Sequence, residues 1–223
     1  MLNYIREGHL LLTEGVPAAM IENVAKMAGM PVGPLSLNDE VAIDLAQKIM
    51  RATIADLGEK AVDPELMSLV DTMVDKHGRL GRKNGKGFYE YPPKPGKKHL
   101  WPGLKDMYPQ IEDTDALDVQ ELKDRLLVSQ ALEAARVFQE GVVTDVREAD
   151  VGSILGFGFA PWSGGTLSYI DMMGTENFVA LCKKLQKKHG VRFKPNKLLV
   201  EMAKNGESFY ERFNPKADVD QAA

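Results

Sequence analysis

Residues that could perform chemistry are few in this chain and lie far apart. They are one cysteine, Cys182, and four histidines: His9, His77, His99 and His189. Nucleophilic catalysis would need a Ser, Cys or Thr beside an imidazole, and no GxSxG, HExxH or EF-hand pattern brings such groups together. His77 and His189 fall at predicted helix ends, where the helix dipole favours positive side chains. We therefore predict no catalytic residue and no metal ligand in this chain.

Two glycine-rich segments resemble nucleotide-binding loops but lack the residues that define them. Residues 81–87 read GRKNGKG, which is short of the Walker spacing and has no Ser or Thr to hold magnesium. Gly156 and Gly158 follow a helical pattern, without the third glycine and the distant acidic residue of a dinucleotide fold. The sequence thus predicts neither a P-loop nor a Rossmann unit.

A cationic turn, residues 79–87, is a stronger candidate for binding. It combines three glycines with four cations: Arg79, Arg82, Lys83 and Lys86. Such a turn could meet phosphate groups through charge and backbone amides. A solvated turn whose glycines adopt positive φ angles is the alternative interpretation.

Two bends rich in Gly and Pro, residues 29–34 and 156–165, contain no titratable side chain. They cannot perform catalysis, but they could form the walls of a hydrophobic pocket or a dimer interface. Helix-packing corners are the favoured interpretation of both bends. The carboxylates Asp39, Glu40 and Asp44 share one predicted helix start, where negative charge is favoured on structural grounds.

Composition indicates a folded protein that acts on a small molecule or a protein. The 223 residues are 44% hydrophobic and 27% charged, which excludes a disordered or collagen-like chain. A net charge of -4 argues against nucleic acid or an anionic membrane as partner. No apolar stretch approaches the ~18 residues of a membrane span, and the first residues, MLNYIRE, do not show the basic start and apolar run that a signal peptide would need. A lone cysteine suits a reducing cytosol.

The hydrophobic pattern predicts an all-α fold. Apolar residues recur at helical spacing, whereas only residues 87–91 look extended. The predicted helices are 4–13, 18–27, 41–57, 64–77, 120–139, 146–154, 176–188 and 196–204. Gly58 and Gly78 are placed to end two of these helices, and Asp63 with Pro64 is placed to start one.

Two halves of the chain repeat each other around a proline-rich connector. Glu14-Gly15-Val16 matches Glu140-Gly141-Val142, and two further pairs follow in the same order, GPL…D with GTL…D and NG…FY with NG…FY. We infer a duplicated helical unit of about ninety residues rather than a solenoid, which requires at least three copies. The predicted domains are a first repeat at 1–91, a linker at 92–118, a second repeat at 119–213 and a tail at 214–223.

The repeat also bears on the beginning of the chain. The second copy's first helix starts earlier, relative to the repeat, than the residue that corresponds to Met1. We therefore expect that the first copy starts inside its first helix and that the sequence was cut from a longer one.

Three blocks carry a resemblance to a known family. EGVPAAMIENVAKMAGMPVGPLSLNDEVAID, GRLGRKNGKGFYEY and EGVVTDVREADVGSILGFGFAPWSGGTLSYIDMMG resemble the duplicated C-terminal helical region of 3-hydroxyacyl-CoA dehydrogenases, as in the multifunctional fatty-acid oxidation α-subunits. The resemblance covers nearly all of Met1–Phe213. It implies the 6-phosphogluconate-dehydrogenase C-terminal-like type of helical fold.

The resemblance also implies a function and two site residues. In the family, an NAD-binding Rossmann domain with a catalytic His–Glu dyad precedes this region, and a hydratase/isomerase domain lies further upstream. Lys83 corresponds to the lysine of the G-[KR]-K-x-G-x-G-F-Y motif that reaches toward the nicotinamide cofactor. Leu155 stands where the family has a substrate-contacting tyrosine, so only an apolar contact remains there. Asn3 is not the family's substrate-binding asparagine, which would fall just before Met1.

We therefore expect the substrate-cleft and association region of an NAD-dependent dehydrogenase that oxidises 3-hydroxyacyl-CoA in β-oxidation. Its implied partners are the absent Rossmann and hydratase domains, acyl-CoA, and a second copy or a thiolase subunit. By itself the chain should bind no NAD and be inactive. The end of the sequence lacks a peroxisomal Ser-Lys-Leu, which favours a bacterial cytoplasm. The alternative function is a stand-alone helical acyl-CoA-binding or interaction module without catalysis.

Overall fold

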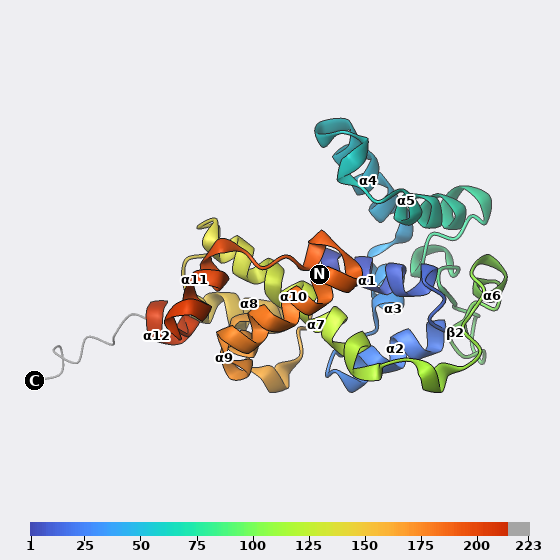
Figure 1. Ribbon diagram of the computed structural model, residues 1–223. Coiled ribbons are helices and arrows are strands. Elements are labelled where there is room, and N and C mark those ends of the chain that lie inside the picture. The colour runs from blue at the N-terminus through green and yellow to red at the C-terminus, as the bar shows by residue number, and fades with distance from the viewer. Residues whose placement is uncertain (214–223) are drawn as a thin grey trace, which may run out of the picture. The chain divides into compact units, whose positions relative to one another are not determined.

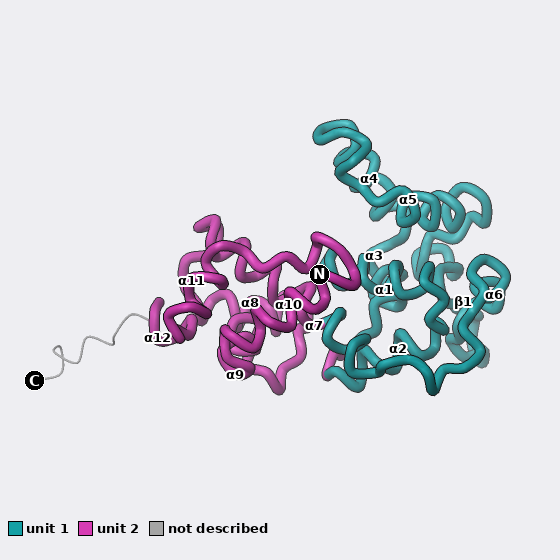
Figure 2. Tube along the Cα trace, viewed as in Figure 1, with its two compact units in different colours: residues 1–28, 32–126 teal, residues 29–31, 127–223 magenta. Residues whose placement is uncertain are grey.

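The computed structural model describes residues 1–213, and the predicted tail at 214–223 lies outside the described residues. Helices dominate these residues, and each of their two strands has only two residues (Figure 1). The chain divides into two compact units, each described here by itself. Unit 1 contains residues 1–28 and 32–126, and unit 2 contains residues 29–31 and those from 127 onward (Figure 2). The predicted all-α fold is confirmed, whereas the predicted domain boundaries stay a prediction.

Unit 1 contains the first six helices, both strands and the start of the seventh helix. The elements are α1 (Leu2–Thr13), α2 (Ala18–Met27), α3 (Pro34–Val41), α4 (Ile43–Leu57), α5 (Pro64–Asp71), β1 (Tyr89–Glu90), β2 (His99–Leu100), α6 (Leu104–Met107) and α7 (Val119–Gln139). A π-helical turn, Thr72–Lys76, continues α5. Short 3-10 turns lie at Glu59–Ala61, Arg82–Asn84 and Thr114–Ala116.

Unit 2 contains the rest of α7 and five further helices. These are α8 (Val146–Phe157), α9 (Thr166–Met173), α10 (Thr175–His189), α11 (Lys197–Asn205) and α12 (Phe209–Phe213). Its 3-10 turns lie at Pro161–Ser163 and Val191–Phe193. Local signals explain the ends of α8: the Asp145 carboxylate accepts hydrogen bonds from two amides of the first turn, and Gly158 ends the helix in the left-handed region at φ 69°.

Helices α3 and α9 were not predicted, because side chains from distant helices fix their first turns. In unit 1, Glu22 Oε1 accepts hydrogen bonds from the amides of Leu35 at 2.9 Å and Ser36 at 3.3 Å. In unit 2, Asp150 Oδ1 accepts them from Leu167 at 2.7 Å and Ser168 at 3.2 Å. A carboxylate satisfies the unpaired amides of a helix start, but its sequence position does not announce this role.

The predicted 41–57 helix is divided at Ala42. Helix α3 ends at Val41 and α4 begins at Ile43, with Ala42 between them at φ 75° and ψ 129°. Its counterpart in the repeat, Gly174, joins α9 to α10 at φ 84° and ψ 132°. The two units therefore use one corner geometry, which glycine adopts freely and alanine adopts under strain.

The proline-rich segment packs against the rest of unit 1 at several points. Leu100 pairs with Tyr89, and His99 pairs with Glu90, in an antiparallel ladder. The Trp101 amide donates to the Phe88 carbonyl at 2.9 Å. Further along, the Ile111 amide donates to the Gly15 carbonyl at 2.8 Å. Of residues 87–91, predicted as extended, only Tyr89 and Glu90 thus form a strand, the first of this small sheet.

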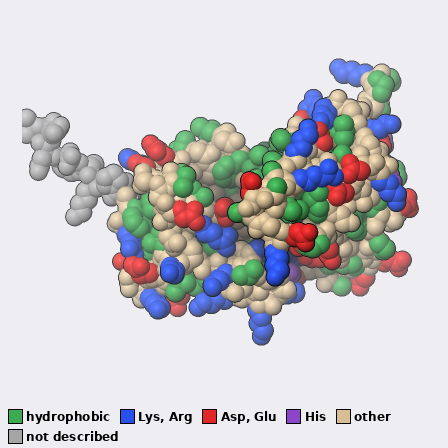
Figure 3. Space-filling view, turned by 90° about the horizontal axis from the view of Figure 1, so that it is seen from above, with side chains coloured by type: hydrophobic (Ala, Val, Ile, Leu, Met, Phe, Trp, Pro, Cys, Tyr) green, Lys and Arg blue, Asp and Glu red, His purple; other side chains and the backbone are tan. Residues whose placement is uncertain are grey.

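Each unit has its own apolar core. The Phe88 ring in unit 1 and the Phe209 ring in unit 2 are fully buried, as their equivalent positions in the repeat predict. Basic and acidic side chains are interspersed on the face drawn in Figure 3. None of the helices within residues 1–213 is long and apolar enough to cross a bilayer.

Candidate functional site

The cationic turn is held in place by one carboxylate from α3. Asp39 accepts hydrogen bonds from the Phe88 amide at 2.8 Å, the Tyr89 amide at 2.9 Å and the Tyr91 hydroxyl at 3.0 Å. Gly87 passes so close to this carboxylate that a Cβ atom there would overlap it. The glycine pattern of the turn therefore serves a close backbone approach.

Burial dominates the electrostatics of Asp39. It raises the pKa of the carboxyl to about 6, against the opposing effect of the three hydrogen bonds and of Lys98. The same arrangement recurs in unit 2, where Asp171 accepts from the amides of Phe209 at 2.8 Å and Tyr210 at 3.0 Å. Burial raises the pKa of Asp171 as well.

The four cations of the turn have different surroundings. Arg79 is 4% exposed and donates to the carbonyls of Gly87 and Tyr89, so it supports the turn from inside. Arg82 forms an exposed ion pair with Glu40. Lys86 is exposed. Arg79 is thus not available to an external phosphate, contrary to the prediction that all four cations could meet one.

The Lys83 side chain lies beside the first turn of α4. Its ammonium forms an ion pair with Asp44, and the Lys83 side chain remains 45% exposed. The hydrogen bond from Lys83 lowers the pKa of Asp44. The described part of the chain therefore offers a half-exposed cation at this position, neutralised by one carboxylate that an incoming anion would have to displace or share.

The two Gly/Pro bends meet within unit 2. Gly29 lies against Trp162, and a Cβ atom at Gly29 would overlap the indole. Gly158 lies against the Pro31 ring. These contacts make the bends a packing corner, as the favoured interpretation predicts. Leu155, in the last turns of α8, is 81% exposed and is open to an apolar contact.

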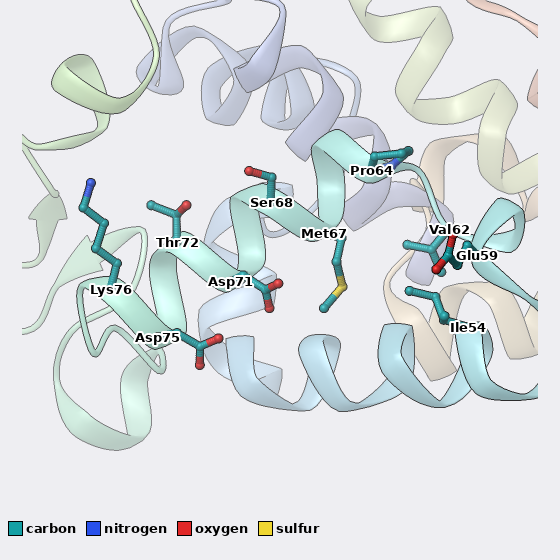
Figure 4. Close-up of a pocket in the computed structure, with 10 residues that line it drawn as sticks. All are labelled: Ile54, Glu59, Val62, Pro64, Met67, Ser68, Asp71, Thr72, Asp75 and Lys76. Atoms are coloured by element: carbon teal, nitrogen blue, oxygen red, sulfur yellow. The ribbon is translucent and has the colours of Figure 1, made fainter.

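A polar hollow of about 670 Å³ lies between α4 and α5 (Figure 4). Met67, Asp71 and Asp75 point toward α4 in this view. Both carboxylates are already satisfied, since Gln47 Nε2 donates to them at 2.7 and 3.0 Å and Arg51 Nη2 at 3.0 and 3.1 Å. No group of His, Cys, Asp and Glu within residues 1–213 could hold a metal ion.

A second, apolar groove in unit 1 was missed at the level of the sequence. It is lined by residues of α1, α3 and α4, by the segment Ala61–Asp63 and by Leu66 of α5, and it has His9 and Asn38 in its floor. Comparison of the two copies could have revealed it. His9 and Asn38 are polar, whereas the residues at the equivalent positions of the second copy, Ala135 and Ile170, are apolar.

Comparison with known proteins relates this duplicated all-α fold to 3-hydroxyacyl-CoA dehydrogenases. Residues 1–91 match the family model for 3-hydroxyacyl-CoA dehydrogenase, C-terminal domain. The Escherichia coli K12 3-hydroxybutyryl-CoA dehydrogenase structure is similar at a TM-score of 0.65 and 20% identity, over 92% of this chain and 58% of that chain. The dehydrogenase part of multifunctional enzyme 1 from C. elegans gives 0.62 and 14%, over 90% and 45%. At these identities, the two structures support the fold.

A curated relative shows a higher sequence identity than the two solved structures. The fatty acid oxidation complex subunit alpha of Shewanella loihica is 36% identical over 208 residues, which are 93% of this chain and 29% of that protein. The chain thus spans under a third of the length of this curated relative. The recognition of a C-terminal helical region of the 3-hydroxyacyl-CoA dehydrogenase family is confirmed.

Proposed function

We propose that this chain is the substrate-cleft and association region of an NAD-dependent 3-hydroxyacyl-CoA dehydrogenase of fatty-acid β-oxidation. The observation that carries the proposal is the 36% identity to a fatty acid oxidation subunit, which extends over 208 residues and so includes both copies of the repeat. A bacterial cytoplasm is the proposed location.

Oxidation of a 3-hydroxyacyl-CoA requires a nicotinamide held against the substrate carbon and a base for the hydroxyl proton. The described residues do not fit a dinucleotide, because their one sheet has two short strands and no glycine-rich strand–turn–helix. His9 is fully buried, and burial lowers its pKa to about 4. His77 packs edge-on against Trp101 at 5.0 Å between ring centroids. We infer that both the cofactor site and the base come from domains outside this chain.

Two residues of this chain are proposed to contribute from its surface. Lys83 would supply a positive charge toward the nicotinamide cofactor, since it remains 45% exposed beside Asp44. Leu155 would supply an apolar contact to the acyl substrate, since it is 81% exposed on α8. Neither residue can accept a hydride or replace the nicotinamide site, so the chain alone is expected to be inert.

A chimera tests this function directly. The corresponding segment of the Shewanella loihica subunit is replaced by this chain, and NADH formation from 3-hydroxyacyl-CoA is measured. We expect turnover by the chimera, and none by the isolated chain or by a subunit in which the segment is deleted.

Two results would contradict the proposal. Turnover by the isolated chain would require an active site within it. A folded but inactive chimera, combined with acyl-CoA binding by the isolated chain, would favour a stand-alone acyl-CoA-binding module instead.

A further inference from the structure

The groove of unit 1, called the α1–α4 groove, is apolar at its mouth. Its volume is about 330 Å³, within the ~300–1,000 Å³ typical of small-molecule pockets. Leu2 of α1 and Leu45 and Ile49 of α4 line it and are 54%, 47% and 39% exposed. Aliphatic side chains exposed together along a concave surface favour an aliphatic ligand.

The floor of the groove is polar. His9 and Asn38 are fully buried; the Asn38 side chain interacts with the His9 imidazole, and no other group of the described residues hydrogen-bonds to either side chain. Nε of Arg6, one turn before His9, is buried without a partner. Buried polar atoms without partners destabilise a fold, so their presence here calls for a ligand that completes them.

The second copy of the repeat shows that the fold does not need this polar floor. Ala135 and Ile170 occupy the corresponding positions in unit 2, and both are fully buried. The same helical corner therefore forms with apolar side chains alone. The polar floor is a property of the α1–α4 groove rather than of the repeated fold.

The donors in the floor define the head group of the ligand. Arg6 lines the groove and forms no ion pair within the described residues, and Asp63, the acidic residue of the lining, accepts the Glu65 amide at the start of α5. The His9 imidazole is neutral at pH 7, because burial lowers its pKa to about 4 despite the nearby Asn38 side chain, so it offers one donor and one acceptor. The Asn38 amide adds further donors. One cation with neutral donors suits a single carboxylate better than a phosphate, which prefers several cations.

We propose that the α1–α4 groove binds a medium-chain aliphatic carboxylate, with its carboxylate at Arg6, His9 and Asn38 and its chain along Leu45 and Ile49. This site goes beyond the proposed function, since it uses neither Lys83 nor Leu155 and needs no dinucleotide. It lies within unit 1.

Titration calorimetry of the purified chain with octanoate tests the site. We expect saturable binding of one octanoate per chain, and binding of octanamide weaker by about tenfold, because only the carboxylate gains from the Arg6 charge. Arg6→Gln should weaken octanoate by about tenfold and leave octanamide nearly unchanged.

Replacing the two floor residues by those at the equivalent positions of the second copy tests the role of the polar floor. His9→Ala combined with Asn38→Ile should reduce octanoate affinity by more than about tenfold. If that variant does not fold, Leu45→Glu at the exposed mouth serves instead, since its charge repels the ligand without entering the core. Val191→Ala, at a 75% exposed position of unit 2, is the matched control and should bind normally.

Three results would overturn the site. They are the absence of saturable octanoate binding, equal binding by the folded floor variant or by Leu45→Glu, and equal affinity for octanoate and octanamide. None of these measurements involves NAD or turnover, so their failure leaves the proposed function untouched.

Discussion

The two units hold their Phe-Tyr turns, at residues 88–89 and 209–210, with equivalent carboxylates. They differ in how their first helices are anchored. Asp39 and Asp171 each accept two amides of the following FY pair, and Tyr89 and Tyr210 each reach a second carboxylate. By contrast, Glu7 is buried against Arg125, whereas its counterpart Glu133 forms an exposed pair with Arg136. Duplication has thus kept the contacts that hold the Phe-Tyr turn of each unit, while the ion pairs of the first helices have diverged.

This comparison identifies where function can be sought. A feature present in both units is explained by the fold they share, and a feature of one unit requires a separate reason. Arg125 has a structural role, because it is 2% exposed and joins the start of α7 to Glu7 of α1 and to Glu14, the residue that follows α1. The His9–Asn38 floor has no counterpart in unit 2, where the equivalent residues are Ala135 and Ile170, which is why a ligand is proposed for it.

The largest effects are expected from the equivalent phenylalanines. Phe88→Ala and Phe209→Ala should each lower the free energy of unfolding by about 3–5 kcal/mol, because both rings are fully buried. Urea denaturation of both variants measures this. If both midpoints stay within error of the wild type, the equivalence of the two turns is wrong.

The divergent anchors should give unequal effects. Arg125→Ala leaves Glu7 buried without its charge partner and should cost about 3–5 kcal/mol. Glu133→Gln breaks only the exposed pair with Arg136 and should change stability by less than about 0.5 kcal/mol. Equal losses in thermal or urea denaturation would contradict this contrast.

The shared carboxylates predict a dependence on pH. Since the pKa of Asp39 is about 6 in the folded protein and 3.8 is its ordinary value, the folded state holds an extra proton between these two pH values. Acidification from about pH 7 to about pH 4 should therefore stabilise the wild type relative to Asp39→Asn, by up to roughly 3 kcal/mol at ~1.4 kcal/mol per pKa unit. Asp171→Asn should show a difference of the same sign, because burial raises the pKa of Asp171 as well. Urea midpoints across this range that run parallel for wild type and Asp39→Asn would contradict it.

The corner between α3 and α4 should become more stable when Ala42 is replaced by glycine, the residue at the equivalent corner of unit 2. Ala42→Gly relieves a backbone at φ 75° and should stabilise the chain by about 1 kcal/mol. The reciprocal Gly174→Ala should destabilise it by about 1–2 kcal/mol, since its φ is 84°. Melting temperatures of the two variants should move in opposite directions, and a shared direction would refute the equivalence of the corners.

The smallest effect on stability is expected at Lys83. Lys83→Ala breaks a half-exposed pair with Asp44 and should change the free energy of unfolding by less than about 0.5 kcal/mol. In the chimera, the same change should raise the KM for NAD. An unchanged KM would assign Lys83 to the turn alone.

The sequence by itself determined the helical class, the duplication and most helix ends. Helix signals are local, since capping side chains and glycine stops act within one turn, as Asp145 and Gly158 do for α8. The family resemblance was likewise carried by contiguous blocks, and residues 1–91 match the family model. The roles of Lys83 and Leu155 stay predictions.

Only the tertiary structure decided which polar residues serve the fold and which are left without partners. Glu22 of α2 accepts the Leu35 amide in the first turn of α3, although the two residues are distant in sequence. Arg79 is buried and donates to the Gly87 carbonyl of the cationic turn. His9 and Asn38 meet in one buried floor although they stand on different helices. Hydrogen bonding and burial depend on which distant residues become neighbours, and neither local propensity nor hydrophobic spacing contains that information.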